Sequence, residues 1–113
     1  TAKGTSMLTC VIRYQIDPTK KDQFEEYARN WGQAIPRCGA DLIGYYAPHE
    51  GSSTLAYGIY NVASLADYEA YRARLADDPH GRENYEFAQK EKFLLREDRT
   101  FLTLASAPHG NAT

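Results

Sequence analysis

Hydrophobic and polar positions change their spacing along the chain, and each change predicts a different element. Residues 7–16 are rich in apolar and β-branched types, which predicts a strand. Asp17 and Pro18 then give a helix-start signal, because the carboxylate accepts from free backbone N–H groups and the proline ring presets φ. The following apolar residues recur at steps of three and four, which predicts a helix of about five turns. Its apolar face carries Phe24, Tyr27, Ala28, Trp31 and Ile35.

The rest of the chain predicts two more strands, two helices and a final strand. Six polar or turn-forming residues separate two aromatic-rich runs, so a hairpin is the simplest connection between them. Ser64, followed three residues later by Asp67, predicts a helix N-terminus, and residues 77–81 interrupt the helical pattern that follows. The expected features are a helix end at Pro36 and Gly39, strands at 41–47 and 54–62, a helix from Ser64, a shorter helix at 82–90, and a strand between 93 and 105.

With the interrupted helical region counted once, the order of strand, helix, strand, strand, helix, strand predicts an α+β, ferredoxin-like (βαββαβ) fold. The topology gives an antiparallel sheet with helices on one face, so the other face of a monomer should be polar. In the first strand it is not, because one alternating set contains Ile12 and Tyr14 and the other contains Val11. Soluble monomers rarely leave an apolar face of this size uncovered. We therefore expect a two-fold homodimer whose sheets pack face to face and form an α+β barrel.

Length and composition fit a single domain, which we expect from residue 7 to residue 105. A chain of 113 residues is near the commonest domain size. We expect residues 1–6 to be a disordered or tag-like segment and residues 106–113 to be a flexible tail. A formal net charge of −2 gives no electrostatic footprint for nucleic acid. No apolar run could span a membrane and no secretory signal is evident, so we expect a cytoplasmic protein without nucleic-acid or membrane partners.

Residue types that often carry metal or redox chemistry are scattered through the chain. His49, His80 and His109 stand apart, without the short-range pairing of a metal site. Cys10 and Cys38 lack paired spacing, so we expect two reduced thiols, and a reactive Cys38 is the alternative. No nucleophile elbow, phosphate loop or dinucleotide fingerprint is present in the sequence. The sequence therefore predicts neither a metal site nor a cofactor.

The chain has nine tyrosines, and almost all of them fall on predicted strands and helices. A tyrosine brings a large ring and a hydroxyl that needs a partner when buried, which favours a wet cleft or a subunit interface. An arginine such as Arg72 beside tyrosine hydroxyls would suit a small carboxylate or enolate ligand. His80 lies where one helix gives way to the next, either overhanging a cleft or solvated in a loop. The candidate ligand-binding residues are Tyr14, Trp31, Tyr57, Tyr71, Arg72, His80 and Tyr85.

Several stretches of the sequence resemble one known family in residue pattern and order. They are Tyr14 to Pro18 before an amphipathic helix, Gly44 to Tyr46, Gly58 to Leu65, and Ala76 to Pro79. Over residues 7–105 the chain resembles the NIPSNAP family within the dimeric α+β barrel superfamily. The resemblance implies a two-fold dimer whose sheets form a barrel, in agreement with the two apolar strand faces. It implies a bacterial protein and little chemistry, since bacterial members generally have no assigned reaction.

Three classes of function stay open at this point. The first is a dimer that binds a small organic molecule in a cleft between the sheet and its helices. The second is a cofactor-free monooxygenase or isomerase of the same superfamily, in which tyrosine, tryptophan and arginine orient an aromatic or polyketide-like substrate. The third is a structural or interaction dimer with a filled interior. A cavity between sheet and helices would separate the third class from the other two.

Overall fold

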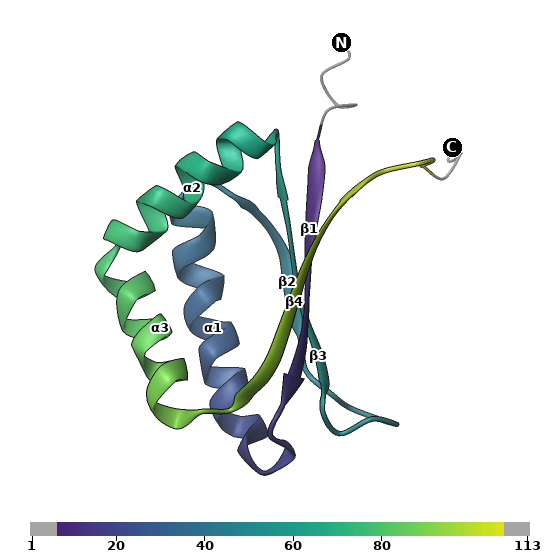
Figure 1. Cartoon of the computed structure of the whole chain (residues 1–113), viewed down its shortest axis with the longest axis vertical. Helices are drawn as coiled ribbons and strands as arrows, with labels where there is room; N and C mark the ends of the chain where they lie inside the picture. The colour runs from purple at the N-terminus through teal and green to yellow at the C-terminus, as the bar shows by residue number, and fades with distance from the viewer. Residues whose placement is uncertain (1–6, 108–113) are drawn as a thin grey trace.

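The fold is the α+β, ferredoxin-like arrangement that the sequence predicts. The structure is a computed structural model that describes residues 7–107, so the expectations for residues 1–6 and 108–113 lie outside the described residues. Figure 1 shows the three α-helices on one side of a single sheet. The elements are β1 (Leu8–Ile16), the short 3₁₀ helix η2 (Pro18–Lys20), α1 (Lys21–Arg37), β2 (Asp41–Tyr46), β3 (Leu55–Val62), α2 (Leu65–Asp77), α3 (Pro79–Glu91) and β4 (Leu94–Thr103).

The first helical region begins and ends where its sequence predicts. Asp17 caps η2 by accepting a hydrogen bond from the Thr19 N–H, and α1 follows directly. α1 ends at Arg37, between Pro36 and Gly39, the two residues that were expected to stop it, and Pro36 lies inside its last turn. The chain leaves the helix at Gly39, whose φ of +107° is a conformation that side chains disfavour. An added Cβ there would also lie 2.6 Å from Nη2 of Arg74, so glycine meets two requirements at this turn.

The third helix is longer than predicted. We expected it from Arg82, but it begins at Pro79, immediately after the end of α2. Asp78 is its N-cap and accepts a hydrogen bond of 2.8 Å from the Gly81 N–H. The same carboxylate accepts from Nη2 of Arg37 at 2.8 Å, which ties α3 to α1. Asp78 and Pro79, which interrupt the helical pattern of α2, therefore start α3. Asp17 and Pro18 start η2 in the same way.

The sheet has strand order β2-β3-β1-β4, and all of its neighbouring strands are antiparallel. Directly opposite residues in such a ladder project from the same face. The inner face, toward the helices, carries side chains that are at most 2% exposed on β1, including Ile12 and Tyr14. The opposite, outer face carries Val11, Tyr57 and Ile59, which are only partly buried.

A bulge in β2 decides which face its tyrosines occupy. The register shifts between Leu42 and Gly44, so Tyr45 lies opposite Gly58 on the inner face and Tyr46 lies opposite Tyr57 on the outer face. A Cβ at Gly58 would lie 2.6 Å from the Tyr45 ring, so glycine makes room for this ring against the sheet. Two adjacent tyrosines thus serve opposite faces.

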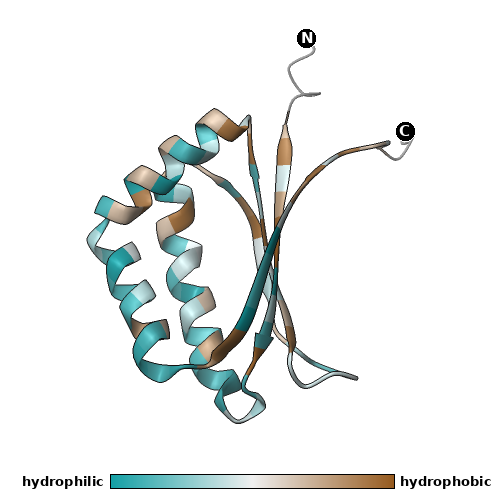
Figure 2. Cartoon of the chain, in the orientation of Figure 1, coloured by the Kyte–Doolittle hydropathy of each residue, from teal (hydrophilic) through white to brown (hydrophobic). Residues whose placement is uncertain are grey.

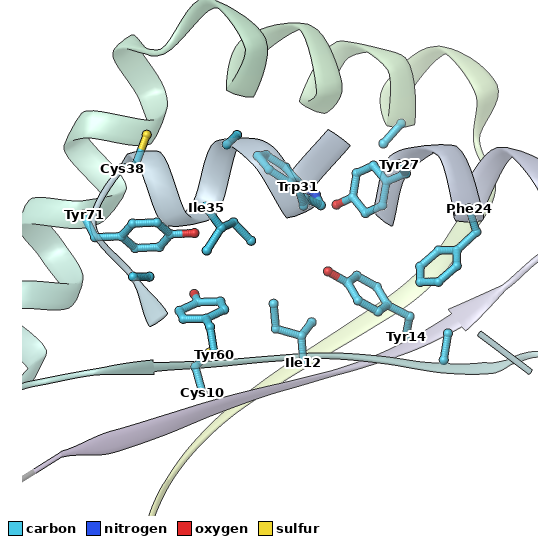
Figure 3. Packing of buried hydrophobic residues seen from close by; sticks show 14 of the residues in the cluster. Cys10, Ile12, Tyr14, Phe24, Tyr27, Trp31, Ile35, Cys38, Tyr60 and Tyr71 are labelled. Carbon is cyan, nitrogen blue, oxygen red and sulfur yellow. The ribbon is translucent and has the colours of Figure 1, made fainter. Parts of the chain in front are cut away.

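The hydrophobic core lies between the inner face of the sheet and α1. Phe24, which has no exposed surface, contacts the rings of Tyr14 and Phe93 with centroids 5.5 and 6.4 Å apart. Figure 3 shows buried side chains from α1 and the sheet pointing toward one another. Within residues 7–107, no helix combines the length and the apolar character needed to cross a membrane.

Candidate functional site

A cavity of about 460 Å³ lies between the inner face of the sheet and the helices. This volume falls within the range of small-molecule sites, and the cavity is open at one side. All four strands and all three α-helices contribute to its lining. The aromatic residues of its inner wall are Tyr14, Tyr27, Trp31, Tyr45, Tyr60 and Tyr71.

Two tyrosines at one end of the cavity hydrogen-bond to each other. The hydroxyl oxygens of Tyr14 on β1 and Tyr45 on β2 are 3.3 Å apart. Burial raises the pKa of Tyr14 and of Tyr45 well above the usual tyrosine value, so both hydroxyls stay protonated at neutral pH. Because only one hydrogen is needed between the two oxygens, the other hydroxyl can donate to a ligand.

A second tyrosine pair lies at the other end of the cavity. The rings of Tyr60 on β3 and Tyr71 on α2 have centroids 5.3 Å apart. Figure 3 shows their hydroxyls, and that of Tyr14, directed into the space between the sheet and α1. Burial raises the pKa of Tyr60 and Tyr71, so these hydroxyls are also neutral. The wall is therefore aromatic with several neutral hydrogen-bonding groups, a surface suited to a planar ligand.

An ion pair from the edge strand β4 completes the wall. Glu97 lies opposite Tyr14 and Arg99 lies opposite Ile12 in the β1–β4 ladder, so both project to the inner face. Nη2 of Arg99 donates to Oε2 of Glu97 at 2.7 Å. About a third of each side chain is exposed, 34% for Glu97 and 30% for Arg99. Partial burial acts to lower the pKa of Arg99, but the interactions with Glu97, Tyr68, Tyr60 and Cys10 together outweigh it and the pKa is raised.

Further charged and aromatic groups line the cavity from the helices. Nη1 of Arg72 on α2 donates to the Tyr68 hydroxyl at 2.7 Å. Arg82 and Glu86 on α3 also line the cavity, and the exposed ring of Tyr85 lies between them in sequence. Cationic side chains thus reach the cavity from both the helices and the sheet.

Comparison with known proteins identifies the family. The family model of NIPSNAP matches residues 9–108. The chain belongs to the NIPSNAP family. No curated protein matches the sequence.

Solved structures of similar fold include other NIPSNAP proteins. An uncharacterized NIPSNAP-like domain protein from Burkholderia xenovorans is 23% identical, with a TM-score of 0.72 over 92% of this chain and 90% of that chain. A NIPSNAP family protein with unknown function from Agrobacterium tumefaciens is 18% identical, with a TM-score of 0.77 over 93% and 94% of the two chains. A putative antibiotic biosynthesis monooxygenase from Nitrosomonas europaea is 13% identical, with a TM-score of 0.69 over 89% and 92%. These likenesses show a shared fold.

The NIPSNAP cleft contains most of the residues that the sequence singled out. The cavity lining includes five of the seven candidates, namely Tyr14, Trp31, Tyr71, Arg72 and Tyr85. Tyr57 instead projects from the outer face, because it lies opposite Arg13 and one position before Gly58. This corrects its expected place in the cleft. His80 is exposed beside a separate depression between α1 and α3, so it does not overhang the main cavity.

Sequence reasoning missed the charged pair of the NIPSNAP cleft. Residues 96–99 are all charged, a pattern typical of a solvated strand edge. The alternation of side chains along the strand would have revealed the pair. Glu97 and Arg99 lie four and two residues from Phe101, so they face the same side as Phe101, which packs against the core. Figure 2 shows this hydrophilic stretch in the middle of β4, between hydrophobic ends.

The cysteines and histidines of this NIPSNAP protein lie where they offer little chemistry. Cys10 and Cys38 are free and buried, and burial raises the pKa of both thiols. The raised pKa of Cys38 argues against the alternative of a reactive thiolate. Among residues 7–107, no group of three or more histidine, cysteine, aspartate or glutamate side chains could hold a metal ion. His109 lies outside the described residues.

Proposed function

We propose that this protein binds a small aromatic anion in the cleft between its sheet and its helices, and that it does so as a two-fold dimer. The observation that carries the binding proposal is the open cavity of about 460 Å³ with an aromatic wall. A purely structural dimer with a filled interior has no need for such a space. The family relationship agrees with the proposal but names no ligand.

The charges around the cavity support an anionic ligand. Three arginines and two glutamates line it, which leaves one net positive charge at neutral pH. The whole chain has a formal charge of −2, so the cavity is positive within an acidic protein. Arginine in a partly desolvated site binds carboxylates well, because its planar N–H groups match two oxygen atoms. A ring with one carboxylate would use both the aromatic wall and this charge.

The uncovered outer face of the sheet supports the dimer. Tyr46 and Leu102 are 50% and 49% exposed there, beside partly exposed Val11, Tyr57 and Ile59. Exposed apolar surface of this extent commonly marks an interface. A two-fold axis would place this face against its own copy, which closes the sheets into a barrel.

Ligand binding is tested by thermal unfolding with a panel of aromatic carboxylic acids and quinones. A ligand at a hundredfold excess over its dissociation constant should add about 2.7 kcal/mol to the unfolding free energy. Arg99→Gln should weaken the response to acids, whereas Arg96→Gln, on the same strand but the outer face, should preserve it. A panel that stabilises nothing would favour the structural alternative.

The dimer is tested by measuring the mass in solution by light scattering at micromolar concentration. Ile59→Lys places a charge in the middle of the outer face and should give a folded monomer. Leu65→Lys is the matched control, because Leu65 is 56% exposed on α2, away from the sheet. A wild-type protein that is a stable monomer at this concentration would refute the dimer.

A further inference from the structure

We propose that the cleft is a proton-transfer site, in which Glu97 removes a proton from a carbon beside a carbonyl group and Arg99 holds a carboxylate of the same molecule. The substrate class is an aromatic 2-oxo acid or a similar carbon acid. This inference rests on the proposed function, since the molecule must first bind in the cleft. It adds a reaction and assigns a role to each member of the β4 ion pair.

The geometry leaves one oxygen of Glu97 available to act as a base. Oε2 accepts the hydrogen bond from Arg99, and no hydrogen bond to Oε1 is formed within residues 7–107. The side chain lines the cavity and is 34% exposed. A carboxylate that is oriented by one partner and open on its other oxygen can approach a bound C–H group within the distance that proton transfer requires.

Other groups around the cleft are less suited to this role. Glu86 also lines the cavity, but among the described residues no hydrogen bond orients its carboxylate, whereas Arg99 holds that of Glu97. The tyrosine hydroxyls of the wall are neutral donors, as is the Cys10 thiol. His49 and His80 do not line the cavity. Among the described residues, Glu97 is therefore the carboxylate that faces the aromatic wall from the sheet.

The same wall can stabilise the product of proton removal. Glu97 lies opposite Tyr14 on the neighbouring strand, so their Cβ atoms are about 5 Å apart. The Tyr14 and Tyr45 hydroxyls are paired with each other and have one hydrogen to spare. Donation of that hydrogen to a ligand oxygen would stabilise an enolate, as hydrogen-bond donors do in sites for developing oxyanions.

The reaction balances without any added reagent. The C–H bond breaks and its proton moves to Oε1 of Glu97, while the electron pair of that bond forms a C=C bond and the carbonyl π pair moves to oxygen. The enolate is held by a tyrosine O–H, and the carboxylate is held by Arg99. Return of the proton to oxygen gives the enol, and return to carbon regenerates the ketone. Both paths restore the Glu97 carboxylate.

Phenylpyruvate is a suitable probe because it combines an aromatic ring, a 2-oxo group, a carboxylate and acidic benzylic protons. In D₂O, wild-type protein should exchange these protons for deuterium faster than buffer alone, which proton NMR measures directly. Glu97→Gln should lower the protein-dependent rate by about 100-fold or more, within the range for loss of a general base. The variant should still show thermal stabilisation by the probe, because Arg99 and the wall remain.

Asp98→Asn is the matched control, since it removes the same charge one residue away on the outer face. This variant should exchange the probe at the wild-type rate. Glu97→Asp gives a second test that keeps the charge but withdraws the carboxylate, and its rate should fall to an intermediate value. Thermal midpoints of all variants without ligand report whether each one folds.

The outcomes separate this inference from the proposed function. If phenylpyruvate stabilises the protein but exchange does not exceed the buffer rate, or Glu97→Gln exchanges as fast as wild type, the proton-transfer role is wrong and binding stands. If phenylpyruvate does not bind while other aromatic acids do, the assigned substrate class is wrong. If no aromatic acid or quinone binds, the proposed function fails as well.

Discussion

The two faces of the sheet begin from similar sequences and end in different environments. On β1, Ile12 and Tyr14 project inward and are 2% exposed, while Val11 projects outward and stays partly exposed. On β3, Tyr60 faces the helices and Tyr57 faces away. Both faces carry apolar side chains, so the presence of apolar residues alone does not distinguish them.

Their difference lies in the polar atoms that each face brings together. The inner face gathers tyrosine hydroxyls and an ion pair around a space of about 460 Å³, a combination suited to a ligand. The outer face carries the apolar side chains of Val11, Ile59 and Leu102, which are suited to packing against another flat surface. A strand with apolar side chains on both faces therefore indicates that both faces pack against something. The polar groups on each face indicate whether it packs around a ligand or against another protein surface.

The largest expected difference between the faces concerns side-chain truncation. Phe24→Ala should destabilise the protein by about 3–5 kcal/mol, because a buried ring that contacts several aromatic neighbours is lost. Ile59→Ala on the outer face should cost about 1 kcal/mol or less in a monomer, since its side chain is partly exposed. Urea unfolding at several protein concentrations measures both values.

Protein concentration is the control in that experiment. If the outer face is covered in a dimer, the Ile59→Ala cost should grow with concentration, while the Phe24→Ala cost should be the same throughout. Equal costs for both variants at every concentration would mean that the two faces do not differ as described.

Alkaline titration gives the second comparison. Burial raises the pKa of Tyr14, Tyr45, Tyr60 and Tyr71, whereas tyrosines of the unfolded chain ionise near pH 10. Above about pH 10 the folded protein therefore holds more protons than the unfolded one, so the unfolding free energy falls as pH rises toward the folded pKa values. Native protein at about pH 11 should show fewer tyrosinates by ultraviolet absorbance than denatured protein, which ionises its nine tyrosines.

Tyr71→Phe sharpens this titration. It should leave the native absorbance at about pH 11 unchanged and lower the denatured absorbance by one tyrosine in nine. An equal loss in both states would show that Tyr71 ionises normally in the folded protein, contrary to its buried position.

The sequence predicts the elements well because their signals are local. Capping at Asp17 and Ser64 and strand alternation each depend on a few neighbouring residues, and the structure confirms these starts. The early start of α3 at Pro79 was missed, because residues 77–81 were taken to interrupt the helical pattern. Proline in the first turn of a helix is instead favourable, since its missing N–H would have no helical partner there.

The candidate site depends on pairings between distant residues, and so it is only partly predictable. Parity shows that Tyr57 and Tyr60 face opposite ways, but the choice of face is set by the β1–β3 register and by the fit of Tyr45 over Gly58. Glu97 and Arg99 look solvated in sequence. Only their places opposite β1 bring them to the cleft.

Removing either hydroxyl of the Tyr14–Tyr45 pair on the inner face should have a smaller effect on the unfolding free energy. Tyr14→Phe and Tyr45→Phe each remove one oxygen of the 3.3 Å contact, and each should cost about 1 kcal/mol in unfolding free energy. The double variant should cost less than the two single costs combined, because both hydroxyls act through the same bond. Denaturant unfolding of the four proteins measures this coupling.

The outer face supplies the control for the hydroxyl pair. Tyr46→Phe removes a hydroxyl from a side chain that is 50% exposed in the single chain, so at concentrations too low for a dimer it should leave stability unchanged. Strictly additive costs for Tyr14→Phe and Tyr45→Phe would mean that the two hydroxyls do not interact in solution.

The smallest effect concerns the helices that make the inner face different from the outer one. Hydrogen bonds from Arg37 and from the Gly81 N–H lower the pKa of Asp78, so the unfolded chain binds more protons in acid and stability falls as pH drops below about 4. Asp78→Asn should lessen this loss, and its effect at neutral pH should be small because asparagine also caps helices.

Asp77→Asn, one residue away, is the control and should lose stability in acid as the wild type does. If Asp78→Asn also lost stability in acid as the wild type does, the contact with Arg37 would not hold α3 against α1. Urea midpoints measured from about pH 2.5 to pH 5 decide between these results, and a residual acid response is expected from Asp17, whose pKa is lowered by its hydrogen bonds from Thr19.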